Sequence, residues 1–313
     1  MLRVLPATAI FLFLVSVAIV LGEKERPPLQ PDDNRIIQRP PPVFNLVEQS
    51  AAGAIGRMVL IEGGTFTRSD PSVPSPPTQR VTLSPFYIGA TEVTRGEFSA
   101  FVNATGYRTK REMQGRQNNW RNCWNMPQND SHPVICIGTE DAAQFCNWKS
   151  QREQLRPVFT FQTQGFKADW TANGYRLPSE AEWEFAARAR GNAGDYWSGT
   201  ASENNLAEYA WYLSSARNRT HAVASLKPNA YNLYDLTGNV SELVYDTYCP
   251  YSRNPETNPH YPSDFLFSDM VGCAFAPGPP AGRGGSWYTI TRINERGWFH
   301  SGPAAGFRLA RNR

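Results

Sequence analysis

The stretch that decides the fold is N-L-Y-D-L-T-G-N-V-S-E-L-V-Y, residues 232–245. It places two acids, Asp235 and Glu242, on either side of a tight Gly238-Asn239 turn. Carboxylates that flank such a turn can direct side-chain and carbonyl oxygens to one point, and hard cations such as calcium require ligands of this kind. The alternative is a turn in which Asp235 only accepts hydrogen bonds from nearby backbone amides. The spacing alone favours that alternative.

The composition indicates a globular chain with many loops. Hydrophobic residues make up 41% of the 313 residues, which suffices for one large domain or two small ones. Because the chain holds 24 glycines and 25 prolines, long helices cannot dominate. The formal net charge of +3 is small and the basic residues are scattered, so no nucleic-acid partner is expected.

The N-terminus has the pattern of an export signal. Arg3 precedes an apolar run over residues 4–21, and V-L-G at residues 20–22 is a tolerable cleavage site. The run is also close to the shortest membrane span, so residues 1–22 are predicted to be a signal peptide or a signal anchor. Residues 23–56 are rich in proline and charge and are predicted to form an extended tether. We therefore expect a periplasmic or secreted protein, held at the membrane if the anchor is not cleaved.

Five cysteines in an exported chain predict disulfide bonds with one cysteine left over. Cys249 and Cys273 bracket a loop rich in proline, asparagine and serine, and we predict a disulfide bond between them. The pairing of Cys123, Cys136 and Cys146 stays open. Cys146 lies on the inner face of a predicted helix, so we expect it to be buried.

Local patterns predict short strands near both ends of the folded part. Residues 58–61 and 65–67, separated by Gly63-Gly64, have the pattern of a hairpin. Residues 80–88 and 306–311 are each predicted to form a strand.

Helix starts are clearer than strands. Thr94 with Glu97, and Ser179 with Glu182, form capping boxes that predict two helices. Thr139 is predicted to cap another helix, and residues 110–128 show no clear period and are predicted to be loop.

One succession of motifs is specific, although no single motif is. The motifs are E-G-G-T-F (62–66), T-E-V-T (91–94), H-P-V (132–134), Y-R-L-P-S-E-A-E-W-E-F-A-A-R (175–188), L-Y-D-L-T-G-N-V-S-E (233–242), R-G-G-S-W (283–287) and G-F-R-L-A (306–310). In this order and spacing the chain resembles the formylglycine-generating enzyme, or sulfatase-modifying factor, family. The resemblance implies an α+β fold over residues 57–313, a single C-type-lectin-like domain with much irregular loop.

The resemblance reverses the preference for the opening stretch and favours calcium. It implies that Asp235 and Glu242 supply side-chain oxygens and that Gly238 and Val240 supply carbonyl oxygens. A structural calcium ion is therefore predicted.

The active site is where the chain departs from the family. Formylglycine-generating enzymes carry two copper-binding cysteines shortly after G-G-S, and thiolates suit Cu(I). Counting from Gly284, those places hold Thr289 and Asn294. We therefore expect no copper and no formylglycine formation by that chemistry. The chain has four histidines and no H-x-x-x-H pair, so we do not expect a three-histidine iron site either.

The segment that lines the family's substrate cleft keeps an acid between two arginines. Glu295 is predicted to be a general base, flanked by Arg292 and Arg296. These arginines can also bind a substrate carboxylate. The alternative is a structural ion pair. The residues predicted to contact the substrate are Ser286, Tyr288 and Trp298.

Two functions of different classes remain open. An exported relative without copper cysteines is similar to the periplasmic branch that matures siderophore chromophores of the pyoverdine type, by an oxidation of a peptide precursor. The other function is a non-catalytic, calcium-stabilised binding or envelope-assembly module. Glu295 favours the enzyme, so we expect a peptide or small-molecule substrate.

Overall fold

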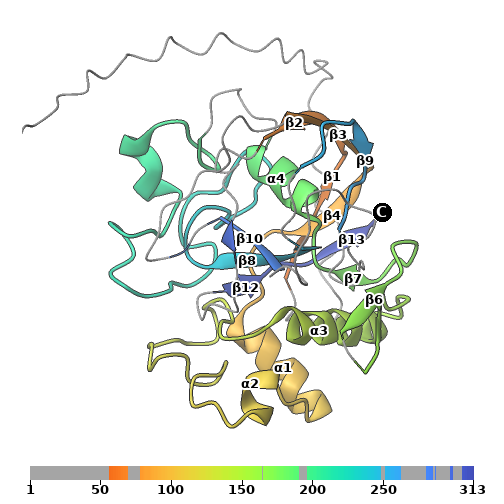
Figure 1. Cartoon of the computed structure of the whole chain (residues 1–313). Coiled ribbons are helices and arrows are strands. Elements are labelled where there is room, and N and C mark those ends of the chain that lie inside the picture. Colours follow the sequence, from red (N-terminus) through yellow and green to blue (C-terminus); the bar gives the residue numbers. More distant parts are fainter. Residues whose placement is uncertain are drawn as a thin grey trace, which may run out of the picture. The chain divides into compact units, whose positions relative to one another are not determined.

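The structure is a computed structural model that describes residues 56–69, 78–163, 165–189, 196–247, 251–261, 280–284, 286, 297–298 and 305–313. The chain divides into residues 1–34 and 35–313, and every described residue belongs to the second unit. Short helices and small sheets alternate with long loops, as the predicted α+β class requires (Figure 1). The predicted signal segment and nearly all of the tether lie outside the described residues. No helix of the described part is long and apolar enough to cross a membrane.

The first sheet joins the two ends of the folded domain. Its strand order is β1-β4-β13-β7, and all neighbours are antiparallel. The C-terminal strand therefore lies between β4 and β7 (Figure 1). The strands are β1 (Met58–Ile61), β4 (Phe86–Gly89), β7 (Tyr175–Arg176) and β13 (Ala310–Asn312).

The second sheet is built on the opening stretch. Strand β8 (Ser241–Thr247) is buried at every position and continues directly from the Gly238-Asn239 turn. It pairs antiparallel with β10 (Pro280–Arg283) and parallel with β12 (Ala305–Phe307). Strand β11 (Gly297–Trp298) completes the order β11-β10-β8-β12. Smaller sheets hold β2 (Gly64–Arg68), β3 (Gln79–Leu83) and β9 (Glu256–Thr257), and β5 (Phe159–Phe161) with β6 (Phe166–Ala168).

The predicted hairpin at Gly63-Gly64 is wrong. β1 pairs with β4 and β2 pairs with β3, so the glycines carry the chain from one sheet to another. Gly63 has φ 74°, and a Cβ there would lie 2.3 Å from the Leu83 carbonyl oxygen. The two strands predicted for residues 80–88 and 306–311 are each divided in two as well, into β3 and β4 and into β12 and β13.

Both capping boxes are confirmed. Helix α1 (Arg95–Thr105) begins after Thr94, whose hydroxyl accepts from the Glu97 amide while the Glu97 carboxylate accepts from the Thr94 amide. Helix α4 (Glu180–Arg188) begins after Ser179 in the same way.

The prediction of Thr139 as a cap is wrong. Helix α3 (Thr139–Arg152) has Gly138 as its N-cap, and the Asp141 carboxylate accepts from the Gly138 amide at 2.8 Å. The inner face, which includes Cys146, is buried as predicted. Residues 110–128 also contain a short helix, α2 (Lys110–Met113), capped by Thr109. A 3-10 turn, η1, covers Glu203–Glu208.

The cysteine pairing left open by the sequence is resolved. Cys123 and Cys136 form a disulfide bond, and Cys146 is a free, buried thiol. Burial raises the pKa of the Cys146 thiol above its usual range. Cys249 and Cys273 lie outside the described residues, so their bond stays a prediction.

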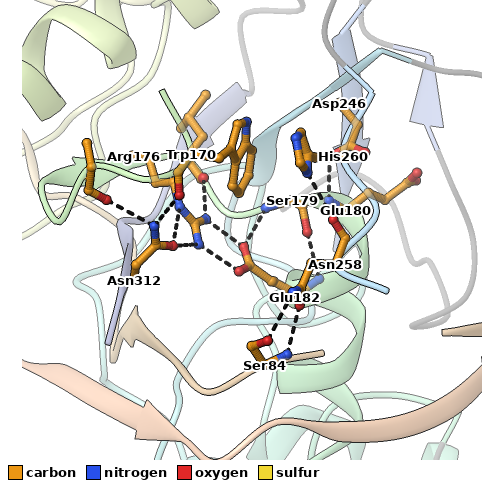
Figure 2. A network of polar contacts seen from close by, with 12 residues as sticks. Ser84, Trp170, Arg176, Ser179, Glu180, Glu182, Asp246, Asn258, His260 and Asn312 are labelled. Carbon is orange, nitrogen blue, oxygen red and sulfur yellow. Dashed lines mark hydrogen bonds and ion pairs between the residues drawn. The ribbon is translucent and has the colours of Figure 1, made fainter. Parts of the chain in front are cut away.

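A polar network fixes the start of α4 to the first sheet (Figure 2). The Arg176 guanidinium donates to both Glu182 oxygens at 2.6 and 2.7 Å. It also donates to the Asn312 side-chain oxygen at 2.9 Å, and the Asn312 amide donates to the Trp170 carbonyl. Strands β7 and β13 therefore set the position of α4, whose Trp183 enters the site described next.

Candidate functional site

The Gly238-Asn239 turn has backbone angles that residues other than glycine rarely adopt. Asp235, Gly238 and Asn239 have φ values of 59°, 81° and 52°. At Gly238 a Cβ would lie 2.2 Å from the Trp211 carbonyl oxygen, so only glycine fits. The Gly238 amide donates to the Gly284 carbonyl at 2.8 Å. The turn is thereby attached to the R-G-G-S-W segment.

Glu242 is held by two side chains from distant elements. The Arg308 guanidinium donates to both Glu242 oxygens at 2.6 Å, and the Trp183 indole donates to Oε2 at 2.8 Å. Arg308 also donates to the carbonyls of Gly89 and Tyr234. Arg308 and Glu242 are both buried, so this is a charge-assisted pair in a medium of low polarity.

A second acid, Glu92, holds the turn from the other side. Its oxygens accept hydrogen bonds from the Asn239 side-chain amide at 2.8 Å and from the Val240 backbone amide at 3.2 Å. Glu92 is 1% exposed. Burial, and then the Asp235 and Glu242 carboxylates, raise the pKa of Glu92 well above its usual range.

Asp235 has one oxygen with a partner and one without. Oδ2 accepts from the backbone amide of Ala224 at 2.7 Å, a residue eleven positions earlier and not one of the turn itself. Oδ1 is buried and has no hydrogen-bond partner. Burial raises the pKa of Asp235 to about 6, against the Ala224 hydrogen bond and the positive charge of Arg308. An oxygen in this state is suited to a cation.

We name Glu92, Asp235, Glu242 and Arg308 the floor cluster. Three carboxyl groups share one arginine, so a bound cation would offset an excess of negative charge. Asp235 Oδ1 fits a hard cation. Glu242 fits less directly, because Oε2 already accepts two hydrogen bonds and Oε1 accepts one. No group of three or more His, Cys, Asp or Glu side chains in the described part is arranged to hold a metal ion, so a calcium site here needs backbone carbonyls.

Comparison with known proteins bears on this geometry. Residues 43–313 match the Sulfatase-modifying factor enzyme 1-like domain, FGE-sulfatase. The chain belongs to this family. It is 31% identical over 235 residues to the chaperone protein LppX of Paenibacillus barcinonensis, covering 64% of this chain and 73% of that one. It is 28% identical over 262 residues to the formylglycine-generating enzyme of Streptomyces coelicolor, covering 65% and 74%.

The FGE-sulfatase assignment agrees with solved structures. PvdO from Pseudomonas aeruginosa is similar with a TM-score of 0.60 and 25% identity, covering 82% of this chain and 95% of that one. Its similarity supports the fold and is consistent with the branch that the missing copper cysteines favour.

The residues predicted for the FGE-sulfatase cleft are described only in part. Ser286 is buried, and Trp298 lies on β11, where it pairs with Ala281. The side chain of Trp298 lies outside the described residues, as do Tyr288, Arg292, Glu295 and Arg296 and the vacated copper places, Thr289 and Asn294. The start of the segment is fixed, because Arg283 pairs with Glu184 at 2.7 Å and with Glu180 at 3.4 Å.

Sequence reasoning missed Glu92, Trp183 and Arg308 as members of the site. Glu92 and Arg308 both occur in quoted motifs, T-E-V-T and G-F-R-L-A. Arg308 lies between apolar residues in a segment predicted to be a strand. A charge in such a place needs a buried partner, and that requirement was the available signal.

Proposed function

We propose that this chain is an exported, copper-independent member of the family that completes the oxidation of a peptide-derived substrate of the siderophore-chromophore type. One observation carries the proposal: the start of the R-G-G-S-W segment is held by the Gly238 turn and by α4, while the sequence that follows it has no cysteines in the places of the copper ligands. The Gly238 amide donates a hydrogen bond to the Gly284 carbonyl, and Arg283 forms an ion pair with Glu184 on α4. Thr289 and Asn294 take the places of the copper cysteines. The similarity to PvdO supports the choice of substrate class.

The proposed chemistry is a two-electron oxidation. The substrate loses two electrons and two protons, and dioxygen accepts both to give hydrogen peroxide. Glu295 takes a substrate proton as general base, and Arg292 and Arg296 keep its carboxylate ionised. The same arginines can bind a carboxylate of the substrate. Ser286, Tyr288 and Trp298 contact the substrate in this proposal.

The proposal includes a structural calcium ion at the Gly238-Asn239 turn. Asp235 and Glu242 would supply carboxylate oxygens, and Gly238 and Val240 would supply carbonyl oxygens. The unpartnered Oδ1 of Asp235 supports this assignment. The ion would stabilise the Gly238-Asn239 turn, which is hydrogen-bonded to Gly284, and it would take no part in the oxidation.

Export is the remaining part of the proposal. The apolar run at residues 4–21 would direct it, as a signal peptide or an anchor. The Cys123–Cys136 disulfide bond supports it, because such bonds persist in oxidising compartments.

The test is metabolite profiling of a deletion strain. We expect a precursor with two hydrogens more than the mature product to accumulate, and wild-type chain to restore the product. Glu295→Gln keeps the shape and removes the basicity, so it should lower turnover roughly 10²-fold or more with little change in stability. Glu203→Gln, at an exposed acid on η1, is the matched control. A Glu295→Gln protein that folds poorly but whose folded fraction is fully active would identify Glu295 as a structural ion-pair member.

A second function is favoured by one observation, the 31% identity to the chaperone protein LppX. In that case the chain binds a partner protein or an envelope component and performs no oxidation. The deletion strain would then keep its metabolites unchanged and would fail to accumulate an exported protein. The Glu295→Gln variant would restore that protein as well as the wild type does.

A further inference from the structure

The end of strand β2 carries a buried arginine whose hydrogen bonds are incomplete. Arg68 is 1% exposed. Its Nε donates to the Gln79 side-chain oxygen at 2.8 Å, while Nη1 and Nη2 are buried and have no hydrogen-bond partner. Buried guanidinium groups are normally paired, because an unpaired buried charge is strongly unfavourable. Two unmet donors on one group therefore indicate a missing acceptor.

The neighbours of Arg68 fix the direction of the unmet donors. Gln79 is fully buried, and its amide nitrogen donates to Ser252 Oγ at 3.0 Å and to Glu256 Oε1 at 2.8 Å. This fixes the Gln79 amide with its oxygen toward Arg68. The Arg68 guanidinium carbon lies 3.9 Å from the centre of the Tyr251 ring. One edge and one face of the guanidinium are thus occupied, and the remaining edge presents Nη1 and Nη2 as a planar fork.

The nearby acids do not accept hydrogen bonds from Nη1 and Nη2 of Arg68. Asp246 influences Arg68 through space, but one of its oxygens accepts from the Glu180 amide at 2.7 Å (Figure 2). The other accepts from the Tyr261 amide at 3.1 Å. Glu256 accepts from Gln79, Ser252 and the Tyr261 hydroxyl. These acids already place negative charge near Arg68. They disfavour a dianion such as phosphate more strongly than a monoanion.

We propose that the Nη edge of Arg68 binds the carboxylate of a ligand that carries a single negative charge. A carboxylate matches the two parallel N–H donors of an arginine fork and would satisfy both buried nitrogens at once. The Tyr251 ring packs against one face of the guanidinium, and the hydrogen bond to Gln79 fixes its orientation. The site uses none of the residues assigned to the floor cluster or to the cleft, so it does not depend on the proposed oxidation.

The first test measures the melting temperature of the purified chain with sodium acetate against sodium chloride of equal ionic strength. We expect acetate to raise the melting temperature in a saturable manner, by roughly 3–6 °C near ten times its dissociation constant. Arg68→Met should abolish the rise. Arg80→Met, at an exposed arginine on the adjacent strand β3, should retain it. Phosphate should give no more than the chloride control.

The second test concerns the protein without ligand. Because two buried nitrogens of Arg68 have no hydrogen-bond acceptor in the protein without ligand, Arg68→Met should leave the melting temperature in chloride unchanged or raise it. If Arg68→Met does not fold, the ¹⁵N resonances of the Arg68 guanidinium in the wild type provide the measurement, and they should shift on acetate addition. The proposal is overturned by unshifted resonances, by an equal acetate effect in Arg68→Met, by equal binding of phosphate, or by a large loss of stability in folded Arg68→Met. The last result would show that Arg68 pairs with a carboxylate of the chain itself.

Discussion

The floor cluster contains a buried oxygen without a hydrogen-bond donor, whereas the end of β2 contains buried nitrogens without acceptors. In the floor cluster Arg308 donates through all three of its nitrogens, yet Asp235 Oδ1 lacks a donor. At the end of β2, Arg68 donates through one nitrogen and two nitrogens lack acceptors. The first region lacks a donor or a cation at one oxygen, and the second lacks acceptors at two nitrogens. Since buried polar groups in folded proteins are almost always satisfied, the proposed calcium ion and the proposed carboxylate ligand would each complete one of these regions.

The largest expected effect comes from removing the one cation of the floor cluster. Arg308→Met leaves Glu242 without its charge partner beside Asp235 and Glu92, so we expect the free energy of unfolding to fall by about 3–5 kcal/mol. Urea denaturation measures this change. Arg313→Met is the matched control, because Arg313 is 58% exposed and contacts Glu62 only at 3.5 Å. We expect it to change stability by less than about 1 kcal/mol. A loss at Arg308→Met as small as that of the control would mean that the floor cluster does not depend on its arginine.

Whether a feature could be predicted from the sequence depends on how far apart along the chain the interacting residues lie. The capping boxes at Thr94 and Ser179 are local, with partners three residues apart, and both were predicted correctly. Strand pairing joins residues that are distant in the chain. The prediction of a hairpin at Gly63-Gly64 was wrong because β1 pairs with β4 and β2 pairs with β3, in different sheets.

The same division holds inside the candidate site. The Asp235–Glu242 stretch and its glycine turn could be found from spacing. The partners of that stretch could not, because Trp183 is 59 residues from Glu242, Arg308 is 66 residues from it, and Glu92 is 147 residues from Asn239. Arg68 gives no sequence signal either, since its lack of a partner is a property of the packed structure.

The next effect is the pH dependence that Asp246, the acid near Arg68, adds to stability. Asp246 lies at the start of α4 and faces Glu180, Arg68 and Tyr261, and burial, then Glu180, raise its pKa to about 7. An acid whose pKa is raised by folding stabilises the fold fully at low pH, and this contribution is lost as pH rises through the folded pKa. Stability should therefore fall between about pH 4 and pH 7, and Asp246 alone accounts for up to roughly 4 kcal/mol of that fall. Asp246→Asn should remove this part, as urea denaturation across pH would show. Curves of equal slope for both proteins would contradict it.

Calcium should have a smaller effect, confined to the floor cluster. An ion that binds only the folded state stabilises it by about 2.7 kcal/mol at one hundred times its dissociation constant, so a chelator should lower the melting temperature. Asp235→Ala should remove that response, while Asp169→Ala, at an acid paired with Arg156 at 3.5 Å, should retain it. A wild-type protein that is insensitive to chelation would mean that Asp235 carries an unmet oxygen without an ion.

The smallest expected effect is the coupling between the two regions, which should be near zero. Strand β8 carries both Glu242 of the floor cluster and Asp246, the acid that acts on Arg68 through its charge, and four residues of strand span roughly 13 Å. The hydrogen-bond partners of Arg308 and Arg68 do not overlap. The stabilisation by calcium and that by acetate should therefore add to within about 0.5 kcal/mol. Asp235→Ala should keep the acetate response, and Arg68→Met should keep the calcium response. A coupling above about 1 kcal/mol would show that the two deficits belong to one site, with the cation and the anion neutralising each other across β8.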